Sequence, residues 1–225
     1  MSLEVVVGSR SGALQQLLLL CCWGFLMSRV KASSGLSSVL GFLRRDVGSG
    51  LVFFVLGLVL RAVPEFLVSV YPVGYETITY YAPAIVAFSG RGLGEVFVEF
   101  FGAGPLFYVL MWLASAVSGA DAFVLLKVVG PVLYGLLAVA FFVFLRRGLG
   151  FEWRLAFVGC LVLVFQPVAL RESWDRFRTV LGLVFLFFGL TVLKSRLGFR
   201  FKWVLVGVFG VLAVLSREYV GFVLF

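Results

Sequence analysis

Three short polar clusters interrupt an otherwise apolar sequence, and the first surrounds a single carboxylate, Glu76. The aromatic residues Tyr75, Tyr80 and Tyr81 stand beside it in the segment YPVGYETITYYAPAI. An acid in apolar, aromatic surroundings costs free energy unless it is paired or used, and such a carboxylate can act as a general base. Glu76 is therefore the candidate catalytic residue, with Tyr75 and Tyr80 as candidate substrate-binding residues. Alternatively, the tyrosines form an interfacial aromatic belt.

The second and third clusters are rich in arginine. The segment RESWDRFR covers residues 171–178, and SREY covers residues 216–219. Arginines beside a helix start offer hydrogen-bond donors to a phosphate, whereas the plainer interpretations are an ion-paired loop and a pair formed near the membrane surface. The candidate substrate-binding residues in these clusters are Arg171, Asp175, Arg176, Arg178, Arg217 and Glu218.

The composition places these clusters in a membrane protein. Of the 225 residues, 62% are hydrophobic and 13% are charged, and the mean hydropathy is +1.13. A soluble domain is nearer half apolar and a quarter charged, so a soluble enzyme is excluded. The chain has no His, which excludes histidine catalysis and histidine metal sites. We expect a multi-pass protein of the cell membrane, in contact with membrane lipid, and no nucleic-acid partner, because basic loops and anionic lipid account for the charge of +8.

Apolar runs of the length that a spanning helix needs, about 20 residues, predict the elements that position the clusters. The shorter run at residues 105–117 is expected to lie on the outer surface, because a span there would turn the later basic loops outward. The predicted fold class is all-α: a polytopic transmembrane helical bundle with a long first outer loop carrying surface-lying helices. The expected spans are residues 47–60 (extendable past Arg61), 122–145, 155–170, 179–193 and 203–215, with another beginning at 219–225.

The chain is expected to have two parts. Residues 1–46 form an N-terminal segment, interpreted as an extra membrane helix or a surface anchor, and residues 47–225 form the transmembrane domain. Two cations near the predicted outer ends of spans, Arg61 and Lys127, are expected to extend their side chains to water. The three polar clusters then meet at the outer face, which is the main indication of a site from the residues themselves.

This layout resembles the GT-C membrane glycosyltransferases, the polytopic enzymes that use polyprenyl-phosphate-linked sugars. The segment GYETITYYAPAI resembles the acidic motif of their first loop, and the glycine- and proline-led stretch from residue 102 resembles their surface helix and following span. SWDRFRTVLGLVFLF and LSREYVGFVLF resemble archaeal, mannosyltransferase-like members. The resemblance covers about residues 48–225. The family more often has Asp where this chain has Glu76.

The resemblance implies inverting transfer of a sugar from a polyprenyl-phosphate donor to an acceptor hydroxyl, with Glu76 as base. It also implies that arginines bind the donor phosphate and that Glu76 and Glu95, or Glu99 in place of Glu95, hold a divalent cation, Mg²⁺ or Mn²⁺. Such enzymes have more spans, so a C-terminal half or a partner subunit is expected. Two alternatives remain open, a non-catalytic membrane scaffold or assembly subunit and a fragment of a transporter; a transporter would place charges near the midplane of the membrane.

Overall fold

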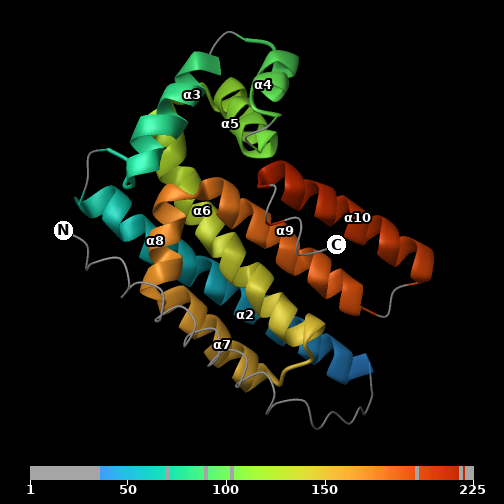
Figure 1. The fold of residues 1–225 in the computed structure, drawn as a ribbon. Coiled ribbons are helices and arrows are strands. Elements are labelled where there is room, and N and C mark those ends of the chain that lie inside the picture. Colours follow the sequence, from blue (N-terminus) through green and yellow to red (C-terminus); the bar gives the residue numbers. More distant parts are fainter. Residues whose placement is uncertain are drawn as a thin grey trace, which may run out of the picture. The chain divides into compact units, whose positions relative to one another are not determined.

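The computed structural model describes residues 36–68, 71–88, 91–101, 104–195, 198–217 and 220, and these residues form helices without a strand (Figure 1). The predicted all-α class is confirmed. The N-terminal membrane helix or anchor and the span beginning at 219 fall almost entirely outside the described residues. The elements, including three π-helical turns labelled η, are α2 (Leu36–Val63), η1 (Pro64–Val68), η2 (Thr77–Tyr81), α3 (Ala82–Phe88), α4 (Leu93–Glu99), α5 (Pro105–Ser118), α6 (Ala122–Val143), η4 (Phe144–Gly148), α7 (Trp153–Phe165), α8 (Pro167–Asp175), α9 (Phe177–Lys194) and α10 (Phe199–Ser216).

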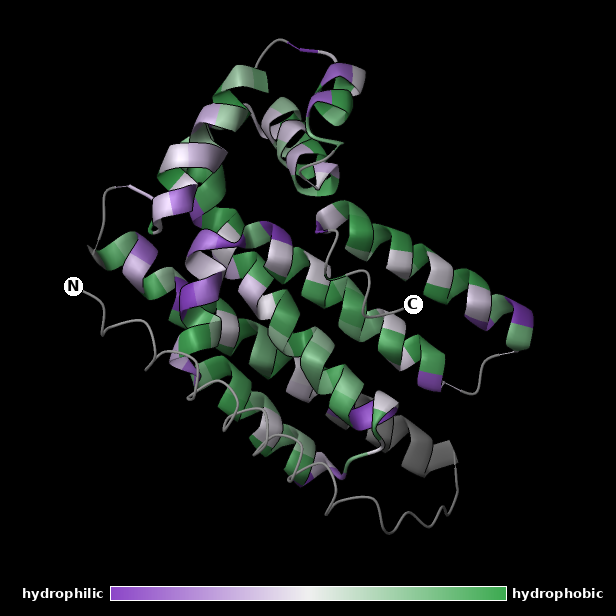
Figure 2. Ribbon diagram, viewed as in Figure 1, coloured by the Kyte–Doolittle hydropathy of each residue, from purple (hydrophilic) through white to green (hydrophobic). Residues whose placement is uncertain are grey.

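Four helices among these residues are long and apolar enough to cross a membrane. They cover Asp46–Leu67, Ala122–Gly148, Phe177–Lys194 and Phe199–Ser216, and each contains a predicted span. Figure 2 shows hydrophobic residues along most of their length and hydrophilic residues gathered mainly near helix ends. A helix satisfies its own backbone polar groups in lipid, so these sequences have one stable way of crossing it. The chain is a transmembrane helical protein.

The predicted span at residues 155–170 is apolar enough to cross a membrane, but it is broken. This stretch is divided between α7 and α8, which are bent by 55° at Gln166. Pro167 occupies the first turn of α8, where its missing N–H costs nothing, but it would break the hydrogen bonding of a continuous helix. The bend directs the carboxyl end of α8 toward the segment that precedes η2.

Helices α2 and α6 approach closely because glycines face each other across their contact. A Cβ on Gly57 would lie 3.2 Å from the Cα of Gly135, and a Cβ on Gly135 would lie 2.7 Å from the carbonyl oxygen of Phe54. Small residues of this kind allow close backbone packing between membrane helices. Helix α9 also packs against α6 and in turn contacts α10.

Helices α3, α4 and α5 lie together at one end of the bundle, called here the loop end (Figure 1). Helix α5 has 14 residues and begins at Pro105, as predicted for a helix too short to span. Ring contacts among Tyr81, Phe107 and Phe177 attach this layer to the start of α9, with centroids 5.2–5.7 Å apart. At the opposite end, Arg146 after α6 forms an ion pair with Asp46 of α2 at 3.2 Å.

Candidate functional site

Five segments bring polar side chains to the loop end of the bundle. These are the end of α2 with η1, the segment before η2, the carboxyl end of α8, the start of α9 and the end of α10. Helices α2, α8 and α10 finish at this end and α9 begins there, because α6 and α7, like α9 and α10, run in opposite directions (Figure 1). The alternation of helices therefore brings the described residues of the three polar clusters to the same end of the bundle.

Glu76 is held through its backbone. Its N–H donates a hydrogen bond to Oδ1 of Asp175, with N and O 3.1 Å apart, and the adjacent Thr77 hydroxyl donates to the carbonyl oxygen of Trp174 at 2.7 Å. The Glu76 side chain is half-buried and forms no hydrogen bond or ion pair with another described residue. The carboxylate is thus positioned while its oxygens stay available to a ligand.

Gly74 allows this contact because the chain passes very close to α8. Its φ is +124°, and a Cβ would lie 2.7 Å from Oδ1 of Asp175 and 2.9 Å from the hydroxyl oxygen of Thr77, and closer still to the carbonyl oxygen of Trp174. Only glycine enters this backbone region readily.

Replacement of Gly74 by Ala is expected to detach the segment before η2 from α8 and to lower the free energy of unfolding by about 1–3 kcal/mol. Unfolding of the detergent-solubilised protein measures the loss. Gly92, where an added Cβ would meet nothing within 4 Å, provides the matched control, Gly92→Ala. Equal stabilities of the two variants would contradict the close approach described here.

Arg178 lies against two buried tyrosines. Its Nε donates to the hydroxyl of Tyr81 at 3.3 Å, and its guanidinium carbon is 5.8 Å from the ring centroids of both Tyr81 and Tyr108. Burial raises the pKa of Tyr81 above its usual value and raises the pKa of Tyr108 to about 12. Both phenols are therefore neutral at ordinary pH, and Tyr81 can accept the hydrogen bond from Arg178.

Charges from three segments act on the same tyrosines. The positive charges of Arg178 and Arg217 lower the pKa of Tyr81 and of Tyr108, against the larger effect of burial, and the negative charge of Glu76 raises both. Electrostatic influence of this kind requires proximity. Arg178 contacts both phenols, Glu76 and Arg217 contribute to the electrostatics of the same two groups, and Asp175 is linked to Glu76 through the amide of Glu76.

The remaining predicted site residues do not join this group. The side chain of Arg171 is exposed, and Arg176 forms an exposed ion pair with Glu172 at 3.1 Å, four residues away on α8. Tyr75 and Tyr80 are 74% and 63% exposed, consistent with the aromatic-belt alternative. Glu95 is exposed in the first turn of α4. Glu218 lies outside the described residues.

Arg61 and Glu65, two charged residues at the loop end, were missed as site candidates. Arg61 was expected to extend to water, and this prediction is wrong: its side chain is 0% exposed and forms an ion pair with Glu65, Nη1 to Oε1, at 2.5 Å. The spacing of four residues was the available signal, because such residues meet on one helix face. Lys127, which was also expected to extend to water, is half-buried, and its ammonium nitrogen lies 5.8 Å from the ring centroid of Phe66.

No group of three or more Asp, Glu, Cys or His side chains in the described residues could hold a metal ion. Among these residues, Glu76 and Asp175 are linked, because the backbone N–H of Glu76 donates a hydrogen bond to the Asp175 carboxylate. A groove of about 460 Å³ lies at the opposite end of the bundle, between α2 and α6, and includes Asp46, Arg146 and Arg147. It is therefore remote from the candidate site.

Comparisons with models of known protein families, with curated proteins and with solved structures find no match to this chain.

Proposed function

We propose that the chain is a membrane glycosyltransferase, or the N-terminal part of one, in the cell membrane. It transfers a sugar from a polyprenyl-phosphate-linked donor to an acceptor hydroxyl at the outer face. The observation that supports this most is that Glu76, whose carboxylate is available, is held against the end of α8 by Asp175, while Arg178 lies against Tyr81 at the same end of the transmembrane bundle. A carboxylate base and arginines at the same end of the bundle suit a reaction in which a hydroxyl loses a proton and a phosphate leaves.

In the proposed reaction, Glu76 removes the proton of the acceptor hydroxyl as that oxygen attacks the anomeric carbon of the sugar. The new carbon–oxygen bond forms as the bond between the anomeric carbon and the phosphate oxygen breaks, and polyprenyl phosphate leaves with the electron pair. Arg178 and Arg217 stabilise the charge that grows on the phosphate. A divalent cation held by Glu76 would supply the same stabilisation, so the assay is run with Mg²⁺, with Mn²⁺ and with a chelator.

Arg217, which is assigned to the donor phosphate, and Arg171, which is not, provide a direct test of that assignment. Arg217→Gln is expected to raise the KM for a polyprenyl-phosphate sugar about 10- to 100-fold, because a charged hydrogen bond to phosphate contributes about 1.5–3 kcal/mol. Arg171→Gln, on an exposed side chain of α8, is the matched control and is expected to change KM less than twofold. The measurement is transfer of labelled sugar by the full chain in lipid nanodiscs.

Equal effects of the two substitutions would contradict the assignment of Arg217 to the donor phosphate. Absence of transfer by the unchanged protein with every polyprenyl-phosphate sugar tested would contradict the proposed function itself and favour the membrane scaffold.

A further inference from the structure

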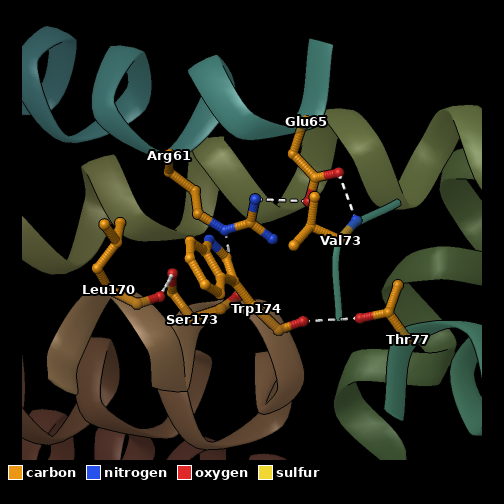
Figure 3. Close-up of polar contacts among 7 residues, drawn as sticks. All are labelled: Arg61, Glu65, Val73, Thr77, Leu170, Ser173 and Trp174. Atoms are coloured by element: carbon orange, nitrogen blue, oxygen red, sulfur yellow. Dashed lines mark hydrogen bonds and ion pairs between the residues drawn. The ribbon is translucent and has the colours of Figure 1, made fainter. Parts of the chain in front are cut away.

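Arg61 and Glu65 form an ion pair (Figure 3). The pair lies at the end of a candidate span, and both side chains are 0% exposed. Removing two charges from water is costly even when they are paired, and two residues four apart on a helix can pair just as well at its surface. The burial of this pair therefore indicates that each charge also binds something outside α2.

Glu65 binds the segment that leads to Glu76. Its Oε2 accepts a hydrogen bond from the backbone N–H of Val73, with N and O 2.7 Å apart, while Oε1 faces Arg61 (Figure 3). Val73 directly precedes Gly74, at which the chain passes against α8. The carboxylate thus fixes the start of the segment that carries the proposed base.

Arg61 binds the carboxyl end of α8. Its Nε donates a long hydrogen bond of 3.5 Å to the carbonyl oxygen of Ser173, and its guanidinium carbon lies 6.0 Å from the ring centroid of Trp174. Gly130 of α6 leaves the room, because a Cβ there would lie only 3.0 Å from Nη2 of Arg61. The next residues of α8, Trp174 and Asp175, are those that hold Thr77 and Glu76.

These contacts form a closed ring from α2 to the segment before η2, on to α8 and back to α2. We infer that Arg61 and Glu65, called here the Arg61–Glu65 clamp, are positioning residues that fix the Glu76 segment against α8. Their effect on catalysis rests on the proposed function, whereas their effect on the order of the segment does not. A pair that served only to stabilise α2 would leave the segment unaffected when removed.

The clamp is removed without leaving an unpaired buried charge by the double variant Arg61→Met/Glu65→Met, because apolar side chains of similar volume often replace a buried pair without loss of folding. The matched control is Glu172→Met/Arg176→Met, which removes an exposed ion pair of the same spacing from the same end of the bundle. Amide hydrogen exchange is measured on the full chain in nanodiscs.

We expect amides of residues 71–77 to exchange at least about 10-fold faster in the clamp variant. In that variant the segment can open without breaking the contacts of Glu65 with Val73 and of Arg61 with Ser173, so opening costs less free energy. Amides within α9 are expected to keep their protection, which shows that the bundle stays folded. The control variant is expected to change residues 71–77 less than twofold. Unchanged protection of residues 71–77 in the clamp variant would overturn the inference.

Transfer kinetics separate the clamp from the proposed function. The clamp variant is expected to lower kcat about 10- to 100-fold with the donor KM within twofold, since a base displaced by about 1 Å loses rate in that range. An unchanged kcat would overturn the positioning role. If the unchanged protein transfers no sugar while residues 71–77 still lose protection in the variant, the proposed function fails and the clamp stands as a structural device.

Discussion

Replacing Glu76 by Gln is expected to lower the kcat for sugar transfer by at least about 100-fold, because positioned general-base catalysis contributes about 10²–10⁴-fold. Glutamine has the shape of glutamate but cannot accept the proton of the acceptor hydroxyl. The fold should be unaffected, since Glu76 is held through its backbone N–H, and its side chain has no hydrogen bond or ion pair within the described part of the chain. Initial rates with a labelled polyprenyl-phosphate sugar, together with thermal unfolding, measure both effects.

The matched control is Glu95→Gln, which removes an exposed acid from α4. Glu95→Gln is expected to change kcat less than twofold and to leave the dependence of kcat on Mg²⁺ or Mn²⁺ as it is in the unchanged protein. A loss with Glu95→Gln as large as with Glu76→Gln would instead support a shared divalent cation, as the resemblance implies. Full activity of Glu76→Gln would contradict the role of Glu76 as base and leave the scaffold alternative favoured.

The transmembrane helices could be predicted because lipid leaves an apolar run of about 20 residues one stable conformation. The predicted span at residues 122–145 corresponds to Ala122–Gly148, and the one at 179–193 to Phe177–Lys194. The break between α7 and α8 could not be read from hydropathy, because hydropathy shows that a segment is apolar but not in which direction its helix axis runs. Pro167 marked the position of a bend, but the 55° angle depends on the helices against which α8 packs.

The candidate site was predicted in part. The topology indicated that Glu76, Asp175, Arg178 and Arg217 would meet at one face. In the structure Asp175 holds the amide of Glu76, and Arg178 contacts Tyr81. The sequence did not separate Arg178 from Arg171 and Arg176, because it did not show that α8 ends at Asp175 and that Arg178 belongs to the first turn of α9.

The burial of Arg61 likewise could not be predicted from the sequence. An arginine at the end of a span can extend to water or turn inward, and the two outcomes have the same sequence signature. What decides here is Gly130, 69 positions later in the chain, which leaves space for the guanidinium on α6. Such a match between distant residues depends on tertiary packing and is not visible in local patterns.

Single substitutions in the clamp are expected to be far more damaging than the double one. Arg61→Met leaves the Glu65 carboxylate buried without its partner, and Glu65→Met leaves the Arg61 guanidinium in the same state. Breaking a buried ion pair by removing one partner lowers the free energy of unfolding by about 3–5 kcal/mol, whereas replacing both partners by apolar side chains is often neutral. The two single effects are therefore expected to exceed the effect of the double variant.

Unfolding of the four proteins in mixed detergent micelles completes this double-mutant cycle, and its coupling energy is expected to be about 3 kcal/mol or more. The exposed pair Glu172 and Arg176 provides the matched cycle, for which the coupling is expected to be below about 1 kcal/mol. The side chains of that pair are 42% and 51% exposed, against 0% for both members of the clamp, so burial is the variable under test. Additive effects of Arg61→Met and Glu65→Met would show that the two charges do not depend on each other, and the burial of the clamp would then need a different physical cause.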